Sequence, residues 1–272
     1  MDKKIGFIGC GNMGSAMTNG ILSSGLCTAD QITASAHTQA TLDRLSAAYG
    51  IQVTSDNREI ARDSDIIFLA VKPHMYKGII KEIRDNVDED KLIIAIAAGI
   101  SHSKLEDYFG KPVKIIRAMP NTPAMVLEAM SALSPNQLVT PEELDTVISV
   151  FESFGKAEVV PEALMDAVTG VSGSSPAYVY LFIEAMADAA VADGMPRAQA
   201  YKFAAQSVYG AAKMVLETGR HPGELKDAVC SPGGTTIAAV AKLEEEGLRN
   251  AVISAQRCCV EKSKKMGKSK KN

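Results

Sequence analysis

Three glycines near the start of the chain have the spacing of a phosphate-binding turn. Gly9, Gly11 and Gly14 follow the apolar run Ile5 to Ile8 and precede residues 15–22, which have the pattern of a helix. In such a turn the first glycine permits the tight bend, the second lets backbone approach a pyrophosphate, and the third allows helix and strand to pack closely. The free N–H groups of the helix start then bind the phosphates. We expect a dinucleotide site here; the alternative is a glycine-rich turn that binds no ligand.

A second glycine turn lies near the end of the chain. Gly233 and Gly234 are followed by Thr235, Thr236 and a helical pattern. A helix start of this kind offers N–H donors to an anion. Because the first turn accounts for the pyrophosphate, we expect a small carboxylate substrate at the second. The alternative is an ordinary helix start with a threonine as its N-cap.

The end of the second expected strand, residues 31–35, indicates which dinucleotide binds. An NAD site has Asp or Glu about 20 residues after the glycines, where it binds the ribose 2′-OH. Here the strand end reads Ser35-Ala36-His37-Thr38, while Asp30 lies at the opposite end and Asp43 belongs to the next helix. A 2′-phosphate would meet hydroxyls and the His37 imidazole instead of a repelling charge. We therefore expect NADP, the alternative being a neutral edge that accepts both cofactors.

The elements that position these turns alternate between strand and helix over the first part of the chain. Apolar runs at 66–71 and 92–98 suit strands buried on both faces of a parallel sheet, and residues 113–119 form the next expected strand. Ligands bind outside the carboxyl ends of such strands. Each strand exit is therefore a candidate, although ordinary loop punctuation by Gly and Pro is the alternative for any one alone. The exits are Val71-Lys72-Pro73, Ala97-Ala98-Gly99 and Met119-Pro120-Asn121-Thr122-Pro123.

From about Glu162 onward, alanine-rich helical patterns replace the strands. We expect an α/β Rossmann-like dinucleotide-binding domain over residues 1–160 and an all-α dimerisation and substrate domain over 161–272, with residues 157–161 as the seam. The helix from Ser175 is apolar nearly all round. A domain of roughly a hundred residues cannot bury it alone, so we expect it to pack against another subunit. Helices are expected over 175–193, 196–217, 236–246 and 248–265.

Composition excludes several classes of protein. The chain has 272 residues, 46% of them hydrophobic, and a net charge of -3, which gives no electrostatic reason to expect nucleic acid or an anionic membrane. No apolar run approaches the ~18 residues of a membrane span, and no signal peptide precedes the first strand, so we expect a cytoplasmic location. The five cysteines lack metal-type spacing, which favours reduced thiols and no metal site. We interpret the terminal lysines as a solvated, frayed end: Lys262, Lys264, Lys265, Lys268, Lys270 and Lys271.

Over its whole length the chain resembles the Δ1-pyrroline-5-carboxylate reductase family. The resemblance implies NADPH-dependent hydride transfer to the C=N bond of 1-pyrroline-5-carboxylate, giving L-proline in the last step of proline biosynthesis, with NADH as a weaker donor. It also implies homodimers that often assemble into decamers. The segments that carry it are Phe7 to Met13, Ala70 to Pro73, Met119 to Pro123, Gly170 to Tyr178 and, most diagnostic, His221 to Asp227 leading into Ser231 to Thr236.

The resemblance also implies the site residues. It places the substrate carboxylate on Thr235 and Thr236, beside Gly234, with Glu162 lining the same site. Ala228 falls at another lining position, where some family members carry a different residue. The cofactor positions it implies are Ile8, Gly9, Cys10, Gly11, Asn12, Met13, Ser35, Asn57, Ala70, Val71, Lys72, Pro73, Ile96, Ala97 and Ala98, to which the strand edge adds His37.

The expected chemistry needs little acid catalysis. A protonated cyclic imine is already electrophilic, so the site must orient and desolvate it more than donate a proton. We expect no indispensable acid and take Thr236 as the catalytic residue that orients the substrate.

Two rival functions remain. A β-hydroxyacid dehydrogenase also joins a Rossmann domain to a helical one, but it uses a lysine on the long helix, and none occurs between Lys156 and Lys202. A catalytically silent NADP(H)-binding regulator or scaffold is the other rival, against which the second glycine turn argues.

Overall fold

The computed structural model describes residues 1–267 and divides the chain into two units by its internal contacts. The first unit contains residues 1–174 together with the described residues from Cys259 onward. The second contains Ser175–Cys258. The terminal lysines Lys268, Lys270 and Lys271 lie outside the described residues.

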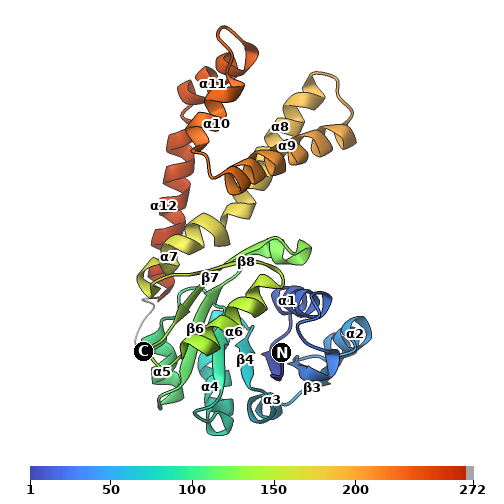
Figure 1. Ribbon diagram of the computed structural model, residues 1–272, viewed down its shortest axis with the longest axis vertical. Helices are drawn as coiled ribbons and strands as arrows, with labels where there is room; N and C mark the ends of the chain where they lie inside the picture. Colours follow the sequence, from blue (N-terminus) through green and yellow to red (C-terminus); the bar gives the residue numbers. More distant parts are fainter. Residues whose placement is uncertain (268–272) are drawn as a thin grey trace. The chain divides into compact units, whose positions relative to one another are not determined.

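The first unit is built on an eight-stranded sheet with the order β3-β2-β1-β4-β5-β6-β7-β8 (Figure 1). The neighbouring strands from β3 to β6 pair in parallel, β7 is antiparallel to β6, and β8 is parallel to β7. The carboxyl ends of β1 to β6 therefore meet at one edge. The strands are β1 Ile5–Ile8, β2 Ile32–Ser35, β3 Gln52–Thr54, β4 Ile66–Leu69, β5 Leu92–Ala95, β6 Lys114–Met119, β7 Ala129–Pro135 and β8 Gly155–Val159.

Helices cover both faces of this sheet, because strand side chains alternate between two apolar clusters. One face packs against α1 (Asn12–Ser23), α2 (Gln39–Tyr49) and α6 (Pro141–Glu152), and the other against α3 (Asn57–Asp63), α4 (Tyr76–Ile83) and α5 (His102–Phe109).

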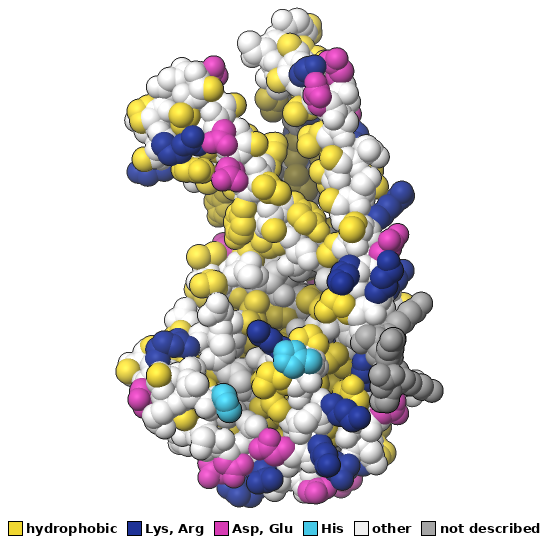
Figure 2. All heavy atoms as spheres, turned by 180° about the vertical axis from the view of Figure 1, so that it is seen from behind, with side chains coloured by type: hydrophobic (Ala, Val, Ile, Leu, Met, Phe, Trp, Pro, Cys, Tyr) yellow, Lys and Arg dark blue, Asp and Glu magenta, His cyan; other side chains and the backbone are white. Residues whose placement is uncertain are grey.

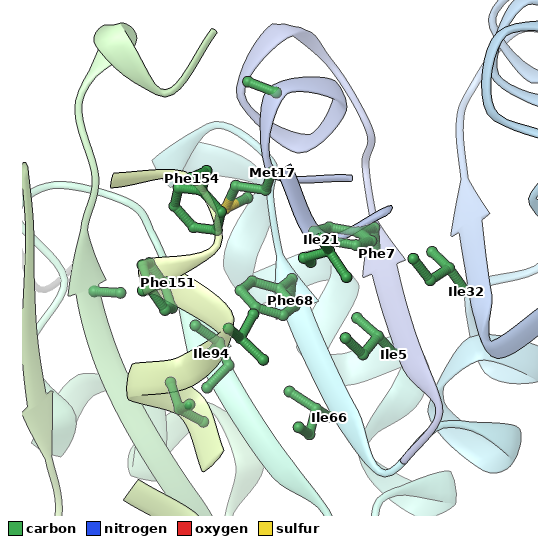
Figure 3. Packing of buried hydrophobic residues seen from close by; sticks show 14 of the residues in the cluster. Ile5, Phe7, Met17, Ile21, Ile32, Ile66, Phe68, Ile94, Phe151 and Phe154 are labelled. Atoms are coloured by element: carbon green, nitrogen blue, oxygen red, sulfur yellow. The ribbon is translucent and has the colours of Figure 1, made fainter. Parts of the chain in front are cut away.

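Aromatic rings fill the centre of the first cluster (Figure 3). The rings of Phe7 and Phe68 stack with centroids 4.7 Å apart, Phe151 lies 5.9 Å from Phe68, and Phe154 lies 5.2 Å from Phe151. This row of rings joins the middle strands of the sheet to α6.

The division between the two units differs from the sequence-based expectation. The segment expected as a seam, residues 157–161, lies largely in β8, where Leu133 of β7 is the register partner of Val159. The contacts divide the chain instead after Ser174, because Met165 of α7 (Met165–Val168) packs with Met119 and Ala132 at the end of the sheet. Ser263, near the end of the chain, also donates a hydrogen bond to Asp166. Residue 160 as a functional domain boundary stays a prediction.

The second unit is helical, as expected. It contains α8 (Ser175–Ala192), α9 (Arg197–Thr218), α10 (Pro222–Val229), α11 (Thr235–Glu245) and the first part of α12 (Leu248–Gly267). Ala187, Ala200 and Ala204 form the buried contact between α8 and α9. Larger apolar side chains stay exposed, with Leu181 at 66% and Phe203 at 64%, and Figure 2 shows apolar side chains gathered over these helices. A single chain does not bury α8.

Among residues 1–267, no helix combines the length and the apolar character that crossing a bilayer requires.

Truncating Phe151 tests the aromatic row. Phe151→Ala leaves a cavity between α6 and Phe68 and should lower the free energy of unfolding by about 3 to 5 kcal/mol, measured by urea unfolding followed by circular dichroism at fixed protein concentration. Leu138→Ala is the control, because Leu138 is 45% exposed and its truncation should change the free energy by less than ~0.5 kcal/mol. A loss below about 1 kcal/mol for Phe151→Ala would contradict the packing described.

Candidate active site

The glycine turn between β1 and α1 has the geometry of a phosphate cradle. Gly9 has φ +81°, and a Cβ built there would overlap the Val71 side chain. A Cβ on Gly14 would lie 3.0 Å from Sγ of Cys10, whereas a Cβ on Gly11 would have no atom within 4 Å. Gly9 and Gly14 are therefore needed for packing within the protein, and Gly11 faces open space. This space fits a pyrophosphate at the helix start.

The start of α1 is open. Gly11 is its N-cap, and no side chain among the described residues makes a capping hydrogen bond there. The N–H groups of the first helical turn have no intrahelical acceptor. The α1 N-terminus can therefore bind an anion.

A hydrogen-bonded network joins this turn to two other expected cofactor positions. Gly9 donates its N–H to Oγ of Ser35 at 3.3 Å, and that hydroxyl donates to Oδ1 of Asn57 at 2.6 Å. Asn57 in turn donates to the Glu82 carboxylate at 3.2 Å. Ser35 is buried at the end of β2, so its hydroxyl holds the turn and the start of α3 in place.

The two candidates for 2′-phosphate binding differ in their surroundings. His37 is exposed in the loop after β2. Arg44 of α2 directs its Nη2 to Oγ of Ser15 in α1, at 3.4 Å, and so brings positive charge beside the glycine turn. We did not predict Arg44 from the sequence. The available signal was an arginine in the helix that follows the second strand, because in NADP sites a nearby arginine accommodates the 2′-phosphate.

Tyr76 connects two further groups of expected cofactor residues. Its buried hydroxyl donates to the carbonyl of Leu69 at 2.6 Å and accepts from the Ala97 N–H at 3.2 Å. The exits of β4 and β5 therefore lie beside each other, with Ala70 to Pro73 on one and Ile96 to Ala98 on the other. Burial raises the pKa of Tyr76, so its hydroxyl keeps the proton it donates.

At the third candidate exit, after β6, Asn121 has a structural role. The Asn121 amide donates to the Ser172 carbonyl at 3.0 Å, and its oxygen accepts from the Met130 N–H at 2.9 Å. Both polar ends of this side chain are thus used within the protein.

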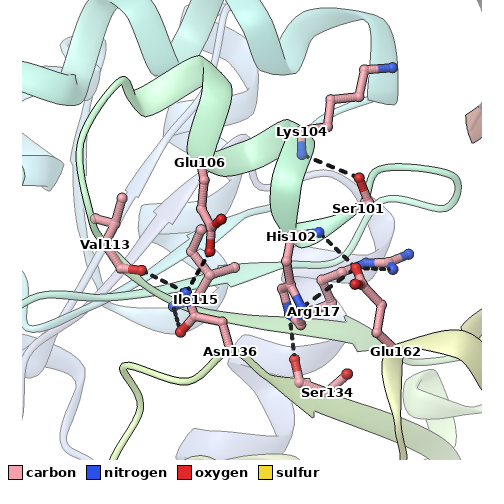
Figure 4. Close-up of polar contacts among 10 residues, drawn as sticks. All are labelled: Ser101, His102, Lys104, Glu106, Val113, Ile115, Arg117, Ser134, Asn136 and Glu162. Atoms are coloured by element: carbon pink, nitrogen blue, oxygen red, sulfur yellow. Dashed lines mark hydrogen bonds and ion pairs between the residues drawn. The ribbon is translucent and has the colours of Figure 1, made fainter.

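Glu162 lies in a cluster of charged groups (Figure 4). It is the first residue of the short η5 helix (Glu162–Leu164), and its Oε1 accepts from the His102 N–H and from Nη1 of Arg117, each at 2.7 Å. Partial burial raises the pKa of Glu162, but these two donors outweigh it, so the pKa lies below the ordinary value and the carboxyl group is ionised. We did not predict either donor from the sequence.

The second glycine turn is also open, in the helical unit. The N-cap of α11 is Gly234, with φ -80° and ψ 172°, and no side chain among the described residues caps it. The alternative of a threonine N-cap is therefore wrong. Thr235 is the first residue of α11 and is exposed, while Thr236 is partly buried. The N–H groups of this turn can bind an anion.

Two family models match the chain. Residues 162–266 match the model described as pyrroline-5-carboxylate reductase dimerisation, and residues 4–99 match the model described as NADP oxidoreductase, coenzyme F420-dependent. Together they cover both the helical unit and the glycine turn.

Similar proteins match the chain from end to end. The pyrroline-5-carboxylate reductase of Escherichia coli is 55% identical over 99% of this chain and 100% of its own length. A solved pyrroline-5-carboxylate reductase from Coxiella burnetii has a TM-score of 0.93 and 34% identity, covering 99% of this chain and 100% of that one. The enzyme from Plasmodium falciparum, solved with NADP bound, has a TM-score of 0.88 and 34% identity over 98% of both chains.

Adding a methyl group at Gly11 tests the cradle. The Gly11→Ala side chain enters open space, so the free energy of unfolding should change by less than about 1 kcal/mol. The same methyl group stands where a pyrophosphate would lie, so NADPH affinity should fall at least about tenfold in a fluorescence titration. Gly78→Ala is the matched control, because Gly78 also has no atom within 4 Å and should bind NADPH normally. Unchanged affinity in Gly11→Ala would remove the pyrophosphate from this turn.

Proposed function

The chain belongs to the pyrroline-5-carboxylate reductase family, and on this basis we propose that it uses NADPH to reduce the C=N bond of 1-pyrroline-5-carboxylate, giving L-proline. The observation that carries the proposal is sequence identity of 40% to 55% to three reductases of this name, over 98% or more of the chain. The chain is an oxidoreductase with a Rossmann-like N-terminal domain and a helical dimerisation domain. The open glycine turn at Gly11 supports the use of a dinucleotide.

The proposed roles of the residues follow from their local geometry. NADPH, when bound, supplies the hydride that the imine carbon accepts. The α1 N–H groups after Gly11 bind the pyrophosphate, and the exits of β4 and β5 line the cofactor site. The N–H groups of Thr235 and Thr236 bind the substrate carboxylate, and Thr236 orients the ring. Because the imine nitrogen enters protonated, these residues need only position and desolvate the substrate.

NADPH is the preferred donor in this proposal, and NADH a weaker one. Residues 35–38 carry no carboxylate that would repel a 2′-phosphate. Arg44 and His37 are the basic groups near this edge and the glycine turn, and Arg44 is held by Ser15. The NADP-bound Plasmodium falciparum enzyme supports the same choice.

The chain assembles as a homo-oligomer through its dimerisation domain. We propose a homodimer as the basic unit, with the decamer as the further assembly that the family resemblance implies. The exposed apolar side chains of α8 and α9 support burial against a second copy. A cytoplasmic location is part of the proposal.

Turnover of the proposed substrate pair is the direct test. Addition of 1-pyrroline-5-carboxylate should cause loss of the reduced-nicotinamide absorbance, and kcat/KM for NADPH should exceed that for NADH by about tenfold or more, since a bound 2′-phosphate makes charge-assisted hydrogen bonds. Absence of consumption would favour the silent NADP(H)-binding scaffold, and oxidation of a β-hydroxy acid by NADP⁺ would favour the dehydrogenase. Equal kcat/KM values for NADPH and NADH would contradict the cofactor preference but not the proposed reaction.

Replacing Thr235 with proline tests the carboxylate site. Proline is favoured as the first residue of a helix, and the preceding Gly234 is already extended, so Thr235→Pro should keep α11 while removing one N–H. We expect KM for the imino acid to rise about tenfold, the equivalent of one charged hydrogen bond, with KM for NADPH unchanged.

Thr235→Val is the matched control for this substitution, because it removes the hydroxyl and keeps the N–H. Equal KM values for the imino acid in Thr235→Pro and the wild-type protein would show that this N–H does not bind the carboxylate.

A further inference from the structure

The Glu162 cluster is asymmetric. Within the described part of the chain, its hydrogen bonds all reach one carboxylate oxygen, Oε1, which accepts from the His102 N–H and from Arg117. Nδ1 of His102 also lies 3.5 Å from Oε1. No hydrogen bond from a residue among 1–267 reaches Oε2. The Glu162 side chain is 37% exposed, so its second oxygen can accept a hydrogen bond from a ligand.

The donors to Oε1 are held firmly. Arg117 extends from β6 and its side chain is only 9% exposed. The His102 N–H belongs to the first residue of α5, so the positive end of that helix faces the carboxylate. The His102 ring is fixed on its other side, where Nε2 donates to the Ser134 carbonyl at 2.8 Å. Glu162 is consequently both ionised and fixed in direction.

A fixed carboxylate with one free oxygen matches the nitrogen of the proposed substrate. Reduction requires the imine nitrogen to be protonated, which makes it a cationic N–H donor. A carboxylate is the side chain that best accepts such a hydrogen bond. An arginine buried in a sheet is costly unless a charge partner is supplied, and Glu162 is that partner.

We infer that Arg117 is a positioning residue: together with the His102 N–H it holds Oε1 of Glu162, leaving Oε2 to accept the N–H of the protonated imine. This inference rests on the proposed function, because it needs an iminium substrate. Arg117 does not touch the substrate and acts only through Glu162.

Steady-state kinetics on Arg117 variants test this role. Arg117→Met should raise KM for 1-pyrroline-5-carboxylate at least tenfold and leave KM for NADPH within twofold, and Arg117→Lys, which keeps a cation, should raise it less. Loss of folded protein lowers the apparent kcat but does not change KM, so a purely structural role would not produce this pattern. If Arg117→Met does not fold, Arg117→Lys carries the test, with a rise of at least threefold expected.

Two further variants complete the experiment. Lys114→Met is the matched control, because Lys114 lies on the same strand and pairs with Glu143 at 2.7 Å; its KM for the imino acid should equal the wild-type value. Glu162→Gln should raise KM for the imino acid. The double variant of Glu162→Gln and Arg117→Met should show the same KM as Glu162→Gln, since both substitutions act through one carboxylate.

Three results would overturn the inference while the wild-type enzyme still turns over the substrate. One is an unchanged KM in the Arg117 variants, another is an equal rise in Lys114→Met, and the third is full additivity in the double variant. No turnover by the wild-type enzyme would instead overturn the proposed function.

Discussion

Hydrogen-bond donors that a helix cannot satisfy by itself are the constraint on which this structure depends. The first turn of every helix leaves N–H groups without acceptors. In α1 and α11 the N-cap is a glycine that no side chain of residues 1–267 caps, so both helix starts remain open to an anion. The other features at the sheet edge keep the first of these starts open. Gly9 and Gly14 provide the close packing, Ser35 and Asn57 anchor the turn, and Tyr76 fixes the adjacent strand exits.

The cluster around Glu162 places charged groups at the end of a sheet that is mostly apolar. Arg117 lies in β6, where the other buried residues are apolar. Its charge is balanced by the carboxylate of Glu162, which is 45 residues away in the sequence. The pair joins β6 to the η5 helix, while the His102 N–H brings in α5. Three elements are thereby fixed by a single oxygen atom, which gives the cluster a defined geometry.

Local patterns were sufficient to predict most of the elements and the glycine turns. The strands at 66–69 and 92–95 were predictable because both of their faces are buried, which produces unbroken apolar runs. The strand at 114–119 was predictable although Lys114 and Arg117 interrupt its apolar residues. We did not predict β7, since Ser131 and Ser134 interrupt its apolar pattern although both are buried. Contacts such as Arg117 with Glu162, or Arg44 with Ser15, depend on tertiary structure and leave no spacing signal. The threonine cap failed because Gly234, not a threonine, occupies the N-cap of α11.

The exposed apolar side chains of α8 have a consequence for how this protein responds to its own abundance. In the proposed homodimer these surfaces would leave the water, so the folded state would gain stability by mass action and the melting temperature would rise with protein concentration. A cell that makes little of the chain would then obtain disproportionately little native protein. A defective copy that still associates would also enter assemblies with intact copies. The activity of a mixed population would then be lower than the fraction of intact chains alone predicts.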